Sequence, residues 1–301
     1  MKPRFYFLFA FFSVLFLFYP GDSDLIKIFA YNRELFLKKT SEIKKPIFVP
    51  VLKTNYYPEI SAEGVYVVDK KSFTPIYERG ANIKFYPAST TKIITALVAY
   101  DVFNTNKIVK IDELPTEGQM MGLVEGEKIT VEYLIYGTLI QSGNDAAYAL
   151  AHEYGNNKFI ELMNKKAAEL NMKNSHFKNS IGLDEEGQYT SPFDLALAAR
   201  ELLNNEYLSK IVSIKEITIS DVDFKYFHEL SNINKLIGEV SGIGGVKTGY
   251  TENAGENLIS FYKSTDDHEF IIVILKSEDR FEDTLQIIDW IKNNVEFVRV
   301  D

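Results

Sequence analysis

The sequence contains no cysteine among its 301 residues, which excludes structural disulfides and metal sites built from thiolates. Histidine is scarce, and its positions show no spacing suited to a metal ion. They are His152, His176, His228 and His268, and we interpret each as a surface or core residue. We therefore expect neither a metal nor any other cofactor.

Positive charge is also in short supply. Lys and Arg number 33 against 42 Asp and Glu, so the formal net charge is −9, and the sequence has no basic cluster. Proteins that bind nucleic acid need basic patches to meet the phosphates, so the composition argues against a nucleic-acid partner. With 46% hydrophobic residues, the chain can instead bury one large core.

Long apolar runs are absent apart from one at the N-terminus. Residues 5–19 are almost all apolar and follow Lys2 and Arg4, which is typical of a secretory segment. The run is shorter than most transmembrane helices, which need about 17–25 residues. No small-x-small cleavage site follows it. Residues 1–21 are therefore interpreted as a signal peptide or an N-terminal membrane anchor, and both place the remainder outside the cytoplasmic membrane.

The remainder divides into a linker and one large domain. Residues 22–58 have lysine-rich stretches and contain Pro46, Pro50 and Pro58, which predicts a stem. Residues 59–301 then form the expected domain.

Alternating and apolar patterns predict the elements of this domain. Strands are expected at 65–68 and 75–77, as a hairpin, and later at 211–219, 245–250, 257–262 and 270–275. Helices are expected at 88–103, 131–140, 145–154, 157–170, 192–204 and 281–293. Strands at both ends with helices between them predict a mixed α/β fold, in which an antiparallel sheet is flanked by helices and carries an inserted helical lobe.

Three short motifs follow one another along this domain: Ser89-Thr90-Thr91-Lys92, Ser142-Gly143-Asn144 and Lys247-Thr248-Gly249. Together they supply a nucleophile, a base, a proton relay and an electrostatic clamp, the parts needed for acyl transfer through a serine ester. Any one of them could arise by chance, since Ser-x-x-Lys also occurs at Ser41 and Ser175. The three in order, each in a fitting context, argue against coincidence.

The first motif lies where a buried helix, apolar on nearly every face, is expected to begin. Lys92 follows Ser89 by one turn on the same face, which brings the amine within reach of the hydroxyl. Serine is a weak nucleophile until a base removes its proton, and burial beside the charge of Lys247 favours a neutral Lys92. We expect Ser142 to relay a proton to the leaving amine. We expect Asn144 to hold a substrate amide and to orient Lys92.

These residues resemble the D-alanyl-D-alanine carboxypeptidases, the low-molecular-mass penicillin-binding proteins of peptidase family S11. The similarity extends from about Ala62 to about Trp290, and it is carried by residues 86–92, 141–147, 182–191 and 245–251. The resemblance implies the DD-peptidase/β-lactamase-like fold for the catalytic domain, residues 59–301. It also implies removal of the terminal D-Ala from peptidoglycan stem peptides, with β-lactam antibiotics as covalent inhibitors.

The resemblance further implies substrate-binding groups. The backbone amides of Ser89 and Tyr250 would stabilise the oxyanion, and Thr248 would contact the terminal carboxylate of the substrate. Gly249 would let the substrate backbone lie close to the strand, because a side chain there would block it. Many family members have a basic residue just before the next strand that helps hold this carboxylate. Here that stretch, residues 266–269, reads Asp-Asp-His-Glu.

Two other functions fit parts of the sequence. A serine β-lactamase shares the acyl-serine but adds a glutamate-activated water, whereas the acidic stretch Asp184-Glu185-Glu186 belongs to a segment that matches the peptidase signature. A non-catalytic penicillin-binding or cell-wall-binding relative would keep the fold and lose a Ser, Lys or Asn of the motifs, and none is lost. Arg280 is interpreted as a surface charge and Asp145 as a helix-start residue.

Overall fold

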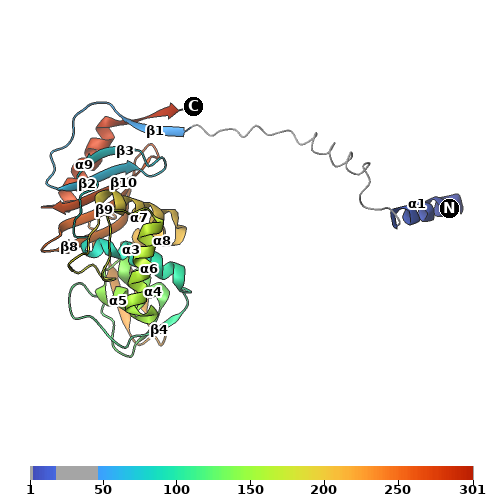
Figure 1. Cartoon of the computed structure of the whole chain (residues 1–301), viewed down its shortest axis with the longest axis horizontal. Helices are drawn as coiled ribbons and strands as arrows, with labels where there is room; N and C mark the ends of the chain where they lie inside the picture. Colours follow the sequence, from blue (N-terminus) through green and yellow to red (C-terminus); the bar gives the residue numbers. More distant parts are fainter. Residues whose placement is uncertain (1–2, 18–46, 301) are drawn as a thin grey trace. The chain divides into compact units, whose positions relative to one another are not determined.

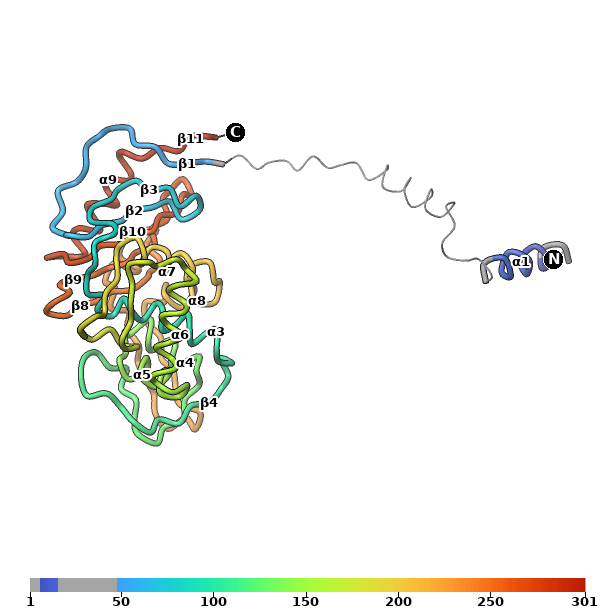
Figure 2. Tube along the Cα trace, viewed as in Figure 1, coloured from blue at the N-terminus to red at the C-terminus, as the bar shows by residue number. Residues whose placement is uncertain are grey.

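Figures 1 and 2 show the computed structural model, which describes residues 3–17 and 47–300. The chain divides into two units, Met1–Pro46 and Ile47–Asp301. In the first unit, α1 (Pro3–Leu17) is a helix of 15 residues. Across the described ranges no helix combines the length and the apolar character needed to span a membrane. The rest of the expected signal or anchor, and the stem as far as residue 46, lie outside those ranges.

The second unit is built around a five-stranded antiparallel sheet in the order β3-β2-β10-β9-β8. Its strands are β2 (Gly64–Asp69), β3 (Pro75–Arg79), β8 (Ile243–Thr251), β9 (Gly255–Lys263) and β10 (Glu269–Ser277). Along β10, Ile271, Val273 and Leu275 face one core, while Phe270, Ile272 and Ile274 face the other. The unbroken apolar run of this strand therefore follows from burial on both faces, and the predicted antiparallel sheet is confirmed.

Helices cover both faces of the sheet. On one face α9 (Arg280–Asn294) packs against β9 and β10, and its Ile287 and Ile291 belong to the same buried cluster as Val65 and Val67. On the other face, the chain between β3 and β8 builds the helical lobe seen in Figure 1. The lobe contains the 3-10 turn η1 (Ala88–Thr91) and the helices α3 (Lys92–Val102), α4 (Val131–Leu139), α5 (Asn144–Tyr154), α6 (Asn156–Glu169), α7 (Pro192–Asn204) and α8 (Glu206–Val212). This is the mixed α/β fold with an inserted lobe that the sequence predicts.

The strand predicted at 211–219 is wrong over its first half. Asn205 caps α8 by accepting hydrogen bonds from the amides of Tyr207 and Leu208, and the helix continues to Val212. The second half of the predicted strand corresponds to β6 (Glu216–Ser220), whereas its partner β7 (Phe227–Ser231) and the ribbon of β4 (Ile108–Lys110) with β5 (Lys128–Thr130) were not predicted. The lobe thus carries two small antiparallel ribbons.

The predicted end of the stem at residue 58 also differs from the structure. β1 (Ile47–Leu52) pairs with β11 (Val295–Val300), and the two lie side by side in Figure 2. Pro50 is compatible with this pairing because one edge of a two-stranded ribbon needs no amide donor. Trp290 Nε1 donates to the carbonyl of Tyr56 at 2.7 Å, which ties the following segment to α9. The compact unit therefore begins at Ile47.

Candidate active site

A cleft of about 300 Å³ opens between β8, η1 and the loop that precedes α5. It brings together residues of all three motifs, which are 40 residues or more apart in the sequence. Six of the eight residues predicted for the site line it: Ser89, Ser142, Asn144, Thr248, Gly249 and Tyr250. The other two, Lys92 and Lys247, are buried behind its wall.

The nucleophile lies on a sharp turn. The helix predicted at 88–103 begins as the 3-10 turn η1, and Ala88 enters it with a positive φ of 48°. Gly182 packs directly on this turn, where a Cβ atom would lie only 1.9 Å from the carbonyl oxygen of Ala88. Asn257 donates from Nδ2 to the carbonyls of Tyr86 and Pro87 at 3.1 and 3.2 Å. The position of Ser89 is thus fixed by backbone contacts on both sides.

The amine of Lys92 is fully buried and has three hydrogen-bond acceptors. Nζ donates to Ser89 Oγ at 2.9 Å, to Asn144 Oδ1 at 2.7 Å and to the carbonyl of Ile181 at 2.7 Å. Burial lowers the pKa of Lys92 to about 7, against the attraction of the Asp145 carboxylate, which raises it. A lysine with this pKa is often neutral near pH 7, as a general base for serine must be.

The second lysine, Lys247, is also buried, and its Nζ donates to the carbonyl of Thr248 at 3.0 Å. Burial and the positive charges of Lys92 and Arg280 hold the pKa of Lys247 well below its ordinary value. Mutual repulsion therefore disfavours the state in which both lysines are charged. The sequence analysis expected the charge of Lys247 to lower the pKa of Lys92; the lowered pKa of Lys92 instead follows from its burial, while the charge of Lys92 lowers the pKa of Lys247.

The second motif is held by the loop before it. Ser142 has a positive φ of 59°, and Asn144 donates from Nδ2 to the carbonyl of Glu117 at 2.7 Å. The backbone amide of Asn144 donates to the carbonyl of Gln119 at 2.6 Å. Asp145 starts α5, as predicted, but its carboxylate also accepts hydrogen bonds from loop amides. The amides that donate to this carboxylate belong to Met121, Gly122 and Leu123, with N to O distances of 2.9 to 3.0 Å.

The third motif lies on β8, at the edge of the sheet. Gly249 was expected to leave room for the substrate, but the structure gives a second reason for glycine. A Cβ atom there would lie 3.0 Å from the amide nitrogen of Ser89 and 3.1 Å from that of Thr90, so β8 could not approach the nucleophile turn. Thr248 is nearly buried, whereas the side chain of Tyr250 is 61% exposed at the edge of the cleft.

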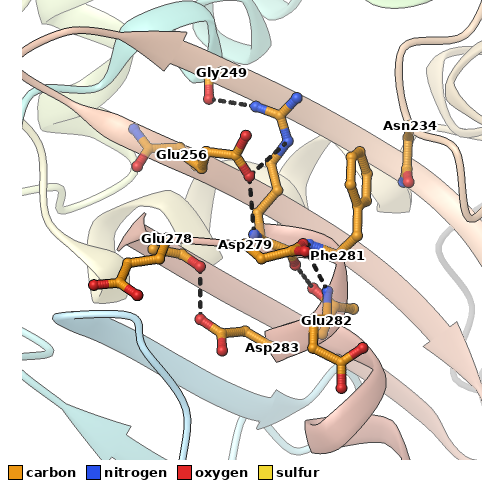
Figure 3. Close-up of polar contacts among 12 residues, drawn as sticks. Asn234, Gly249, Glu256, Glu278, Asp279, Phe281, Glu282 and Asp283 are labelled. Carbon is orange, nitrogen blue, oxygen red and sulfur yellow. Dashed lines mark hydrogen bonds and ion pairs between the residues drawn. The ribbon is translucent and has the colours of Figure 1, made fainter.

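Arg280, at the start of α9, is a cleft residue that sequence reasoning missed. Figure 3 shows its surroundings, with its partners Gly249 and Glu256 labelled. Its side chain is 12% exposed, which corrects the interpretation of a surface charge. Nη1 donates to the carbonyl of Gly249 at 2.9 Å, while Nε lies 4.0 Å from Glu256 and makes no hydrogen bond. A usable signal was Asp279, which caps α9 two residues after β10 ends and so places Arg280 close to the end of that strand.

Comparison with known proteins agrees with this geometry. The D-alanyl-D-alanine carboxypeptidase family, peptidase S11, matches residues 52–279. The chain is 37% identical over 202 residues to the D-alanyl-D-alanine carboxypeptidase DacF of Bacillus subtilis, which covers 64% of this chain and 52% of the relative. It is 33% identical over 222 residues to DacA of Escherichia coli, which covers 67% and 53%. The chain therefore spans about half the length of these curated relatives.

Solved structures show the same relationship. The Streptomyces K15 DD-transpeptidase superposes with a TM-score of 0.73 at 29% identity, covering 78% of this chain and 98% of the other. A D-alanyl-D-alanine carboxypeptidase from Mycobacterium tuberculosis superposes with a TM-score of 0.74 at 26% identity, covering 80% and 94%. The family match, the relatives and the shared fold lead to one conclusion: the chain belongs to the D-alanyl-D-alanine carboxypeptidase family of peptidases, S11.

Proposed function

We propose that this protein is a serine-type carboxypeptidase that removes the terminal D-Ala from peptidoglycan stem peptides through an acyl-Ser89 intermediate. The observation that carries the proposal is the contact between Ser89 Oγ and Lys92 Nζ at 2.9 Å, with the amine buried and its pKa lowered to about 7. A nucleophile and a base in direct contact, with the base oriented by a third group, here Asn144, are the requirements of acyl transfer.

Acylation begins when Ser89 Oγ attacks the carbonyl carbon of the penultimate D-Ala and its proton passes to Lys92. The amides of Ser89 and Tyr250 stabilise the negative oxygen of the tetrahedral intermediate. Ser142 then relays a proton to the amine of the departing D-Ala as the peptide bond breaks. Water, activated by Lys92, attacks the resulting ester, releases the shortened peptide and returns the proton to Ser89.

The carboxylate of the departing D-Ala needs positive charge, and Arg280 supports this role together with Thr248. Arg280 lines the same cleft as Thr248, and a guanidinium can donate charge-assisted hydrogen bonds to a carboxylate. Arg280 thus takes the role of the basic residue that is missing at 266–269.

The alternative as a β-lactamase is less well supported. A β-lactamase of that kind needs a carboxylate free to activate water. Here both oxygens of Asp184 are engaged, Oδ1 with the hydroxyl of Thr251 at 2.9 Å and Oδ2 with the amide of Asn253 at 3.0 Å. The substrate also implies a location outside the cytoplasmic membrane. The N-terminal segment would provide it as a signal peptide or as an anchor to the membrane.

The test is the intact mass of the purified full chain over time after mixing with benzylpenicillin, alongside release of D-Ala from an acyl-D-Ala-D-Ala peptide. We expect one persistent adduct and D-Ala release, both abolished in Ser89→Ala. Ser41→Ala, which removes the serine of another Ser-x-x-Lys sequence, is the matched control and should behave as wild type. An adduct that is rapidly lost as hydrolysed penicillin would indicate a β-lactamase. Absence of both adduct and D-Ala release would favour the binding-protein alternative.

A further inference from the structure

A buried charged pair, Glu127 and His228, lies in the helical lobe and has no part in the reaction described above. Glu127 Oε1 and His228 Nε2 are 2.7 Å apart, and their side chains are 0% and 4% exposed. Glu127 precedes β5 and His228 lies on β7, 101 residues later. Burying two charges costs free energy unless their geometry compensates for it, so the pair calls for a functional explanation.

One ring nitrogen of His228, Nε2, meets the carboxylate of Glu127, and both side chains are buried. A carboxylate beside an imidazole favours its charged form, and the backbone of Met121 acts in the same direction. Burial acts to lower the pKa of His228, but Glu127, the charge of Asp145 and the Met121 backbone together raise it above its ordinary value. The charged groups around this ring, Glu127, Asp145 and Asp221, are all acidic.

The pair holds the far side of the loop that fixes the second motif. Glu127 Oε2 accepts from the amide of Val124 at 2.9 Å, which closes the end of the loop, and the backbone of Met121, in the same loop, favours the charged form of His228. The same loop also contacts the second motif. The carbonyl of Glu117 accepts from the side chain of Asn144, and three loop amides donate to the carboxylate of Asp145. A shift of the loop therefore moves Asn144, and with it the oxygen that orients Lys92.

We propose that Glu127 and protonated His228 are positioning residues, which clamp the loop of residues 117–127 so that Asn144 aligns Lys92 for acylation. The proposal rests on the proposed function, because acylation is its readout. Acylation needs Lys92 neutral, which favours pH above about 7. The clamp needs His228 charged, so alignment is lost as pH rises through the raised pKa of His228. The rate of acylation should therefore depend on pH with a bell-shaped profile.

The test is the second-order rate of acylation by benzylpenicillin between about pH 5 and about pH 9 for the wild-type chain and for Glu127→Gln. Glutamine keeps a hydrogen-bond acceptor and removes the charge that raises the pKa of His228. We expect the alkaline limb to move to lower pH and the rate above neutrality to fall about tenfold, with the acid limb unchanged. Asp101→Asn is the matched control, since it breaks the ion pair of Asp101 with Lys166 elsewhere in the lobe.

If the pair were purely structural, Glu127→Gln would lower the melting temperature, as Asp101→Asn does, and would leave the shape of the pH profile of acylation unchanged. That result would overturn the proposal. If Glu127→Gln does not fold, the imidazole of His228 is titrated by NMR in the wild-type chain. A His228 that is neutral across the pH range of acylation would equally overturn it. Loss of acylation at every pH in the wild-type chain would instead contradict the proposed function, so the two failures are distinguishable.

Discussion

The two walls of the cleft are held by different kinds of interaction. On the sheet side, β8 is one of five strands, and its position follows from the backbone ladder with β9 and from glycine packing against η1. On the lobe side, Ser142 and Asn144 lie beside a loop without regular structure, which is held by side chains such as Asp145 and the Glu127–His228 pair.

This difference has a consequence for substitutions. A backbone ladder distributes its stability over many hydrogen bonds, so a single side chain on β8 has little influence on where its neighbours lie. A loop held by a few buried side chains loses its position when one is removed, because each leaves several backbone groups without a partner. We therefore expect the lobe wall to be more sensitive to single substitutions than the sheet wall.

The largest effect is expected at Lys92, where the walls meet. Lys92→Met removes the base and leaves Ser89, Asn144 and the carbonyl of Ile181 without their shared partner. We expect acylation by benzylpenicillin to fall about 10³-fold or more, measured by intact mass. Near-normal acylation in this variant would mean that another group activates the serine.

Asp145→Ala tests the lobe wall directly. It removes the acceptor of three loop amides and of the amide of Ala146, at a side chain that is 2% exposed. We expect a loss of stability of about 3 kcal/mol, together with a fall in acylation of about 10²-fold. Thermal unfolding and adduct formation check both effects. Asp145→Asn adds a finer measurement: since the Asp145 charge raises the pKa of Lys92, the acid limb of the pH profile should move to lower pH.

Arg280→Gln tests the sheet wall. Among the described residues, Arg280 is the one charged residue that lines the cleft. The guanidinium of Arg280 makes one hydrogen bond to β8, at Gly249, so stability should change little. We expect kcat/KM for an acyl-D-Ala-D-Ala peptide to fall about 10²-fold, because the terminal carboxylate of the substrate loses its charge-assisted partner. A substrate that ends in an amide should lose much less. An equal loss for both substrates would contradict the carboxylate role.

The pH dependence of acylation is a smaller test of the same site. Since Lys92 must be neutral and its pKa is lowered to about 7, acylation should rise with pH up to about that value, before the alkaline fall expected from His228. The rise is about tenfold per pH unit on the acid limb. A rise that continues to the ordinary pKa of lysine would show that burial does not neutralise Lys92.

The sequence predicted the parts of this architecture that have local causes. The apolar runs of β10 and of the helix after Ser89 required burial, and the three motifs identified the residues of the cleft. It failed where a residue acts across the fold. Arg280 reaches the cleft because α9 starts at the end of β10, and Glu127 meets His228 only after the lobe has folded. No local pattern records the contact between Glu127 and His228, and Arg280, which becomes buried, was interpreted as a surface charge.

Tyr250 provides the smallest expected effect, and it separates backbone from side-chain contributions on the sheet wall. Its proposed role is to donate from its amide to the oxyanion, and its ring is 61% exposed at the edge of the cleft. The amide is fixed by the pairing of Tyr250 with Glu256 in β9, which does not involve the ring. Tyr250→Ala should therefore change acylation only about two- to fivefold and leave the melting temperature nearly unchanged, because exposed side chains contribute little to stability. A loss comparable to that of Asp145→Ala would show that the ring itself holds the substrate, and that the sheet wall depends on side chains as much as the lobe wall does.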